Sequence, residues 1–315
     1  MTSFAFVFPG QGSQSVGMLD AWGDHPVVVQ TLQEASDALG EDITALIKNG
    51  PKEALALTTN TQPVMLVSAI AAYRVWLAET GLKPSVVAGH SLGEYSALVA
   101  SGVLTLAQAT PLVRLRAQAM QDAVPVGQGA MAAILGLDAA KIIAICADIT
   151  SASDENGYVQ AANFNDPGQT VISGSKTAVD AACEQLKAAG AKRALILPVS
   201  APFHSALMRP AAEKLQEALK SVTFATSQIP VVNNIDVSVQ TDTEAIKDAL
   251  YRQAFGPVRW VECVAAIKAR GATTIVECGP GKVLAGLVKR IDAQLTGVAL
   301  FDPASLAEVK ALLQS

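Results

Sequence analysis

Residues 84–95 read PSVVAGHSLGEY, and this stretch decides how the rest of the chain is interpreted. Residues 85–88 form a short β-branched run, and residues 94–100 have a composition compatible with a helix. Gly89 and Gly93 bracket Ser91 in the turn between them, which is typical of a nucleophile elbow with an exposed serine hydroxyl. The backbone N–H groups at the start of such a helix, including that of Leu92, have no partner within the helix and can stabilise an oxyanion.

The composition indicates a soluble globular chain. Its 315 residues suffice for two ordinary domains or one large domain with an insertion, and no apolar run approaches the roughly 18 to 20 residues that cross a bilayer. A formal net charge of −5 argues against a nucleic-acid partner, which requires a clustered basic surface. The four cysteines include no CxxC pair, so we expect neither a zinc site nor a disulfide framework, and a reducing cytoplasm as the compartment.

An apolar segment near the start of the sequence leads into a glycine-rich turn. Residues 4–8 are too short and lack the basic flank of a signal peptide, so we expect a first buried strand. Residues 9–14 read PGQGSQ and contain no GxGxxG dinucleotide fingerprint. This turn is either a plain connection or a place where backbone N–H groups approach a ligand, in which case Gln11 supplies a second oxyanion donor.

One arginine in the helical part of the sequence is expected to face inward. Residues 61–79 predict a long helix capped by its first residue, with Pro63 in the first turn. Another helix opens at Thr105 with Gln108 completing a capping box, and its apolar stripe includes Arg116. A buried guanidinium needs an anion, so Arg116 either clamps a substrate carboxylate, pairs with an internal acid, or extends its head group to solvent.

The middle of the sequence predicts a small inserted domain. From 128 to 199 the pattern reads strand, helix, two strands joined by the turn NDPG, helix and strand, which is typical of a split βαβ or ferredoxin-like unit. We therefore expect a large α/β domain with a parallel sheet, formed by residues 1–126 and 200–315, and a small ferredoxin-like domain formed by residues 127–199. The cleft between the two domains is the expected substrate site.

A serine nucleophile needs a base near neutral pH, most often a histidine, and this chain has three. His25 precedes a proline in a surface-like segment, and His90 lies inside the elbow, where its side chain should point away from that of Ser91. His204 follows a strand end in a proline-bounded loop, where a catalytic loop belongs in an open α/β sheet. No acid between Ser91 and His204 has a distinguishing context, so a neutral amide or a carbonyl is expected to orient the imidazole.

These residues resemble a known family, the malonyl-CoA:acyl-carrier-protein transacylases of bacterial fatty-acid synthesis. The resemblance covers nearly the whole chain, and its motifs together are highly specific. They are FPGQGSQ at 8–14, GHSLGEYSALVASG at 89–102, RLRAQAMQDAVP around Arg116, GAMAAILG at 129–136, NFNDPGQTVISG at 163–174, APFHSALM at 201–208, YRQAFGPVRW at 251–260 and ECGPGKVLAGL at 277–287. The resemblance implies a hydrolase-like α/β body with a ferredoxin-like insert, which agrees with the pattern described above.

The resemblance implies a role for each catalytic position. Ser91 is implied as the acylated nucleophile and His204 as the general base and acid. The backbone amides of Gln11 and Leu92 are implied to form the oxyanion hole. Gln253 is implied as the group that orients His204, which would explain why no acid has a distinguishing context.

The resemblance also implies how the acyl group is held. Arg116 is expected to pair with the free malonyl carboxylate, and Gln11 and Asn163 to contact the substrate. Phe203, in the APFH motif, is expected to disfavour acyl groups that carry an α-methyl substituent.

The implied activity is transfer of malonyl from malonyl-CoA to the phosphopantetheine thiol of acyl carrier protein through a malonyl-serine ester, which supplies fatty-acid elongation. We expect no cofactor beyond these substrates, no metal, a cytoplasmic location and a monomer. Because carrier proteins and this chain are both acidic, docking requires a local basic patch. The candidates are Lys187, Lys192, Arg193, Lys282, Lys289 and Arg290.

Two other classes of protein would share these features. A serine esterase or thioesterase has the same elbow but uses water as acyl acceptor, and it normally has an acidic third catalytic residue. A docking subunit would retain the fold without catalysis. Analysis of the products and of the acyl-enzyme distinguishes the three.

Overall fold

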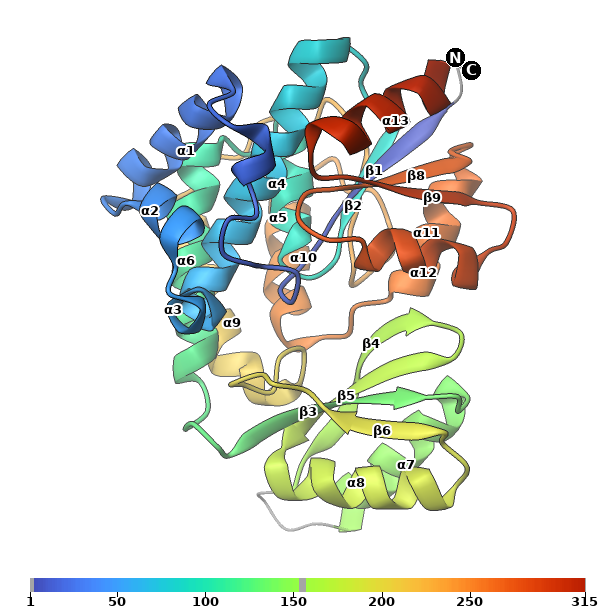
Figure 1. The fold of residues 1–315 in the computed structure, drawn as a ribbon. Coiled ribbons are helices and arrows are strands. Elements are labelled where there is room, and N and C mark those ends of the chain that lie inside the picture. Colours follow the sequence, from blue (N-terminus) through green and yellow to red (C-terminus); the bar gives the residue numbers. More distant parts are fainter. Residues whose placement is uncertain (1–2, 153–156, 315) are drawn as a thin grey trace.

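The computed structural model describes residues 3–152 and 157–314, and within them the chain forms two sheets (Figure 1). All the strand pairs of sheet A are parallel, in the order β7 (Val231–Val232), β2 (Val86–Gly89), β1 (Phe4–Phe8), β8 (Thr274–Cys278) and β9 (Thr296–Leu300). Those of sheet B are antiparallel, in the order β4 (Val159–Asp166), β5 (Gln169–Ser175), β3 (Gly129–Leu135) and β6 (Arg193–Ile196). The predicted α/β class, with a parallel sheet and a split βαβ unit, is confirmed.

Helices cover both faces of sheet A and one face of sheet B. Those outside the sheet B unit are α1 (Pro26–Leu39), α2 (Ile43–Asn49), α3 (Lys52–Ala56), α4 (Thr58–Thr80), α5 (Gly93–Ala100), α6 (Leu106–Asp122), α9 (Arg209–Lys220), α10 (Thr243–Phe255), α11 (Trp260–Ala269), α12 (Val283–Ile291) and α13 (Pro303–Gln314), with 3₁₀ turns η1 (Asp20–Trp22) and η2 (Ala206–Met208). Within that unit, α7 (Ala139–Ala152) and α8 (Lys176–Ala188) cover one face of sheet B (Figure 1). None of the described helices combines the length and apolarity needed to cross a membrane.

The core packs on both faces of sheet A. The phenylalanines of β1 belong to the larger core with α4, where Phe6 meets Tyr73 and Trp76 edge to face at centroid distances of 5.8 and 5.6 Å. Ala5 and Val7 belong to the core on the other face, together with residues of α11 and α12. Because both faces are covered, every residue of β1 is buried and the strand is apolar throughout.

The ends of β1 and β2 place the turn that carries Gln11 beside the turn that carries Ser91. Phe8 pairs with Gly89 in the parallel register, and the backbone N–H of His90 donates to the Phe8 carbonyl at 3.0 Å. The turn that carries Gln11 and the turn that carries Ser91 therefore leave sheet A at the same edge.

Close backbone approach explains the two glycines of the elbow. A Cβ atom on Gly89 would lie 1.8 Å from the carbonyl carbon of Gly93, and one on Gly93 would lie 2.1 Å from the Phe8 carbonyl oxygen. No side chain fits at either position, as the sequence predicted. Between them Ser91 adopts a left-handed φ of +54°.

The start of α4 differs from the sequence prediction. The helix begins at Thr58, because the carbonyl of Leu57 already accepts from the N–H groups of Asn60 and Thr61, each at 2.8 Å. The hydroxyl of Thr61 donates to the Leu55 carbonyl at 2.7 Å, so Thr61 is not the helix cap. Pro63 consequently lies beyond the first turn of the helix. The predicted capping box of Thr105 and Gln108 at α6 is confirmed.

Sheet B turns its uncovered face toward the rest of the molecule (Figure 1). On this face Met131, Ala133, Ala162 and Val171 form a small apolar cluster, against which Phe203 packs. The strands of sheet B all lie within the segment 127–199 that the sequence assigns to the small domain. The domain limits themselves stay a prediction.

The elbow glycines give a test of stability. Gly93→Ala is expected to lower the free energy of unfolding by about 1 to 3 kcal/mol, because the new methyl group overlaps the Phe8 carbonyl. Gly286→Ala is the matched control, since a Cβ there meets nothing within 4 Å and alanine favours a helix by about 0.5 to 1 kcal/mol. Urea denaturation of both variants measures the difference. Equal stabilities would contradict the crowded elbow.

Candidate active site

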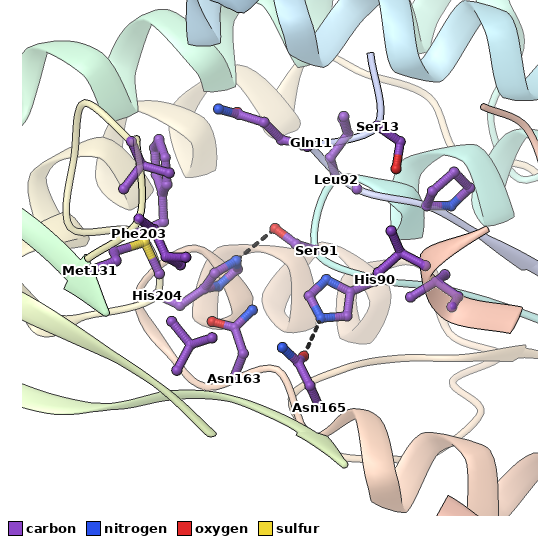
Figure 2. Close-up of a pocket in the computed structure, with 18 of the residues that line it drawn as sticks. Gln11, Ser13, His90, Ser91, Leu92, Met131, Asn163, Asn165, Phe203 and His204 are labelled. Carbon is purple, nitrogen blue, oxygen red and sulfur yellow. Dashed lines mark hydrogen bonds between the residues drawn. The ribbon is translucent and has the colours of Figure 1, made fainter. Parts of the chain in front are cut away.

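Ser91 and His204 meet although 113 positions separate them in the sequence. The Ser91 hydroxyl donates to Nε2 of His204 at 2.6 Å (Figure 2). Both residues have positive φ values, +54° and +59°, which cost non-glycine residues about 1 to 3 kcal/mol each and persist where the surrounding structure imposes them. The backbone thus holds both reacting groups in strained positions that make the contact possible.

Main-chain carbonyls orient the imidazole. Nδ1 of His204 lies 2.9 Å from the carbonyl oxygen of Gln253 and 3.2 Å from that of Gly256. Both oxygens can only accept, so the proton resides on Nδ1 and Nε2 is left to accept from Ser91. The expectation of a neutral amide or carbonyl in place of an acid agrees with this arrangement. The contact between Gln253 and His204 is made by the main chain, while the Gln253 side chain turns to other partners.

The surroundings keep His204 neutral. Its side chain is 2 % exposed, and burial, followed by the nearby charge of Arg116, lowers the pKa of His204 to about 3. A neutral imidazole accepts a proton from a serine hydroxyl, whereas an imidazolium does not.

Arg116 lies next to Ser91. The guanidinium is 2 % exposed and donates through Nη2 to the Ser91 hydroxyl at 3.3 Å and to Oε1 of Gln253 at 3.1 Å, and through Nη1 to Oε1 of Gln62 at 2.7 Å. These partners are neutral, so in the described part of the chain no carboxylate contacts the charge directly. Nε of Arg116 is buried and has no hydrogen-bond partner among these residues. The inward orientation predicted from the helix periodicity is confirmed.

Two backbone N–H groups remain available beside Ser91. Leu92 immediately precedes α5, Gln11 lies in the turn after β1, and both line the same cavity as Ser91. Within the described residues, neither backbone N–H donates a hydrogen bond. The side chain of Gln11 donates to the Thr58 hydroxyl at 3.2 Å.

The cavity has a volume of about 350 Å³ and lies between the edge of sheet A and the uncovered face of sheet B. Phe203 and Met131 line it on one side of the Ser91–His204 pair (Figure 2). Asn163 also lines it and is buried, and its side-chain oxygen lacks a hydrogen-bond partner among the described residues. The residues predicted to act in catalysis or substrate binding all lie in this cavity or contact a residue that lines it. They are Gln11, Ser91, Leu92, Arg116, Asn163, Phe203, His204 and Gln253.

His90 points away from the nucleophile, as expected, and contacts the other sheet. Its Nε2 lies 2.8 Å from Oδ1 of Asn165 on β4, and its ring packs on Trp260 with the centroids 5.4 Å apart (Figure 2). Burial lowers the pKa of His90, so a neutral ring donates to Asn165. The residue before the nucleophile therefore ties the elbow to sheet B.

Sequence reasoning missed the buried polar residues that hold the site from behind. Asn234 accepts from the Ser91 N–H at 2.8 Å and donates to the Gly89 carbonyl at 2.7 Å. Gln62, on α4, accepts a hydrogen bond from Arg116 through its Oε1. The available signals were an asparagine two residues after a parallel strand and a lone glutamine inside an apolar helix.

The potential metal-ligating side chains and the cysteines of the described residues are dispersed. The described residues contain no group of three or more metal-ligating side chains. The four cysteines, Cys146, Cys183, Cys263 and Cys278, are buried and free.

Comparisons with known proteins agree with this geometry. Residues 5–300 match the acyl transferase domain family. The chain belongs to the acyl transferase family. Within it, the chain is 53% identical to the malonyl CoA-acyl carrier protein transacylase of Salmonella typhimurium, over 98% of each chain, and 45% identical to that of Bacillus subtilis, over 97% of this chain and 96% of the other. The family resemblance noted from the motifs is thereby confirmed.

Solved structures of acyl transferases have the same fold. An acyl-carrier-protein S-malonyltransferase from Burkholderia pseudomallei superposes with a TM-score of 0.95 at 62% identity, covering 98% of this chain and 99% of the other. A malonyl-transacylase solved in complex with a type II PKS acyl-carrier protein has a TM-score of 0.95 at 50% identity, with both chains fully covered.

The low pKa of His204 can be measured directly. NMR of protein labelled on the imidazole rings should show that the His204 signals do not titrate between pH 8 and pH 5, because burial and Arg116 keep the ring neutral throughout this range. The signals are assigned by their disappearance in His204→Asn. A midpoint near the ordinary value of about 6.5 would contradict the neutral buried ring.

Proposed function

We propose that this chain transfers the malonyl group of malonyl-CoA to the phosphopantetheine thiol of acyl carrier protein, through an ester on Ser91. One observation carries the proposal. A buried guanidinium, with no carboxylate in direct contact among residues 3–152 and 157–314, lies 3.3 Å from a serine hydroxyl that is itself hydrogen-bonded to a neutral imidazole. Such a site binds an acyl group whose far end is negatively charged, and malonyl is a short acyl group of that kind. The names of the relatives support the same substrate.

The first half-reaction forms the acyl-enzyme. The malonyl carboxylate binds Arg116, and Ser91 Oγ attacks the thioester carbon while Nε2 of His204 takes the hydroxyl proton. The backbone N–H groups of Gln11 and Leu92 stabilise the oxyanion. The C–S bond then breaks, His204 gives its proton to the sulfur, and CoA leaves.

The second half-reaction reverses these steps with another thiol. The phosphopantetheine thiol gives its proton to Nε2 of His204 and attacks the ester carbon. The bond to Ser91 Oγ breaks, and the proton returns to that oxygen. A thioester is exchanged for a thioester, so the chemistry requires neither a metal nor a redox cofactor.

Phe203 and Asn163 line the part of the cavity that, in this proposal, selects the acyl group. Phe203 packs against the apolar face of sheet B and lines the cavity, and in this proposal its ring disfavours an α-methyl branch on the acyl chain. The unpartnered side-chain oxygen of Asn163 is an acceptor for an N–H of the substrate.

In this proposal the carrier protein docks through a basic patch, for which the candidates are six exposed cations, Lys187, Lys192, Arg193, Lys282, Lys289 and Arg290. Lys289 and Arg290 lie on α12, which lines the cavity, and Lys282 immediately precedes this helix. Arg193 begins β6 and Lys192 precedes it, whereas Lys187 lies on α8, which covers the face of sheet B away from the cavity. Arg290 pairs with Asp166 at 3.1 Å, so its charge is partly compensated. A complex of a related transacylase with a carrier protein supports docking of this kind.

The same proposal places the enzyme in the cytoplasm as a monomer. Its cysteines are free and buried, which suits a reducing compartment. One chain holds every group that the reaction uses.

Mass spectrometry of the intact protein tests the function. Incubation with malonyl-CoA is expected to add one malonyl group, which holo-acyl carrier protein then removes and carries. Ser91→Ala should show no adduct, because the nucleophile is absent. The removal step should slow as salt rises, because attraction between exposed charges is screened.

Two outcomes would reject the transferase. Release of free malonate without malonyl carrier protein would indicate a thioesterase. Absence of any adduct on the wild-type protein would indicate a non-catalytic subunit.

Arg116 gives a second test. Arg116→Ala is expected to slow acylation of Ser91 by malonyl-CoA about ten- to a hundredfold, since a hydrogen bond to a charged group contributes about 1.5 to 3 kcal/mol. Acylation by acetyl-CoA should fall much less, because acetyl has no carboxylate. Single-turnover release of CoA measures both rates. Equal losses would remove the carboxylate clamp from the proposal.

A further inference from the structure

Glu94 is a buried carboxylate that the mechanism above does not use. It lies in the first turn of α5, three residues after the nucleophile, and is 3 % exposed. Its Oε2 accepts from the backbone N–H of Asn234 at 2.9 Å and from Nε2 of Gln253 at 3.1 Å. A buried acid in this position requires a reason, because removing a carboxyl group from water is costly.

The Gln253 amide links Glu94 to the substrate clamp. Its Nε2 also donates to the Ser91 carbonyl at 2.9 Å, while its Oε1 accepts from Nη2 of Arg116 at 3.1 Å. A guanidinium can only donate, and the two groups facing Nε2 act as acceptors, so only one orientation of the amide satisfies all its partners. The orientation of this amide therefore places Arg116 beside Ser91.

We propose that Glu94 is a positioning residue for malonyl selectivity: its Oε2 holds the Gln253 amide in the orientation that keeps Arg116 aimed at the acyl carboxylate. This inference rests on the proposed function, since it concerns the group that distinguishes malonyl from uncharged acyl groups. Glu94 itself touches neither the substrate nor the reacting atoms.

The required property of Glu94 is an acceptor atom and not its full charge. Burial raises the pKa of Glu94 to about 7, although the hydrogen bonds from Asn234 and Gln253 and the charge of Arg116 favour the ionised form. A proton on the other carboxyl oxygen leaves Oε2 free to accept both hydrogen bonds. A glutamine at this position offers an amide oxygen that can do the same, whereas a leucine cannot.

The experiment compares Glu94→Leu with Glu94→Gln. The readout is the ratio of single-turnover acylation rates with malonyl-CoA and acetyl-CoA. Glu94→Leu is expected to lower this ratio about tenfold or more, the effect of losing a hydrogen bond to a charged group, and Glu94→Gln to keep it close to the wild-type value. In an Arg116→Ala background, Glu94→Leu should leave the ratio unchanged, because the clamp is already absent.

A second buried glutamate provides the matched control. Glu277 is fully buried and accepts from the Ala285 N–H at 2.8 Å, away from Gln253 and Arg116. Glu277→Gln should leave the malonyl to acetyl ratio unchanged.

Several results would overturn the inference while the function stands. An equal loss of both rates in Glu94→Leu would show that Glu94 only supports the elbow through Asn234. An unchanged ratio, or a Glu94→Gln variant as impaired as Glu94→Leu, would also reject it. If circular dichroism shows that Glu94→Leu does not fold, Gln253→Leu replaces it, because this variant removes the linking amide and retains the carbonyl that orients His204. Failure of the wild-type protein to form a malonyl ester would instead reject the proposed function.

Discussion

The parallel pairing of β1 with β2 is the constraint on which the site depends. It sets the end of β1 against the elbow so closely that only glycine fits at position 93, and it aligns the Gln11 turn with the turn of Ser91. The dense core on both faces of β1 keeps this register from slipping. The Ser91 hydroxyl and the backbone N–H groups of Gln11 and Leu92 are therefore positioned by the sheet before any ligand arrives, and binding energy is not spent on assembling them.

The buried polar side chains at this edge of sheet A form one hydrogen-bond network. Arg116 is desolvated, yet its partners are amides and a hydroxyl, so its positive charge is directed at the cavity. The buried acid Glu94 is linked to Arg116 through the Gln253 amide. Placing an amide between the two charges avoids a closed ion pair, which would leave the guanidinium less able to bind an incoming carboxylate. The same positive charge helps to keep His204 neutral, so that its Nε2 carries no proton before the substrate binds.

Local sequence patterns predicted the structure correctly where the environment of a residue is set by its immediate neighbours in the sequence. The glycines around Ser91, the capping box at Thr105 and the inward side of Arg116 follow from turn sterics and helix periodicity, and the structure agrees with each. The predicted start of α4 was three residues too late, because the hydrogen-bonding series already begins at the carbonyl of Leu57. No side-chain cap marks this position. Asn234 and Gln62 were missed because their sequence context only hints at burial, and their partners Ser91 and Arg116 lie far away in the sequence.

The sequence by itself determined the kind of protein: an α/β body with a ferredoxin-like insert, an elbow serine, one suitable histidine and one inward arginine. Only the tertiary structure decided how these groups cooperate. It showed that main-chain carbonyls orient His204. It also showed that the Gln253 side chain accepts a hydrogen bond from Arg116 and donates one to Glu94. The physical reason is that a motif records which side chains are present, whereas hydrogen-bond partners and desolvation depend on atoms brought together from distant parts of the chain.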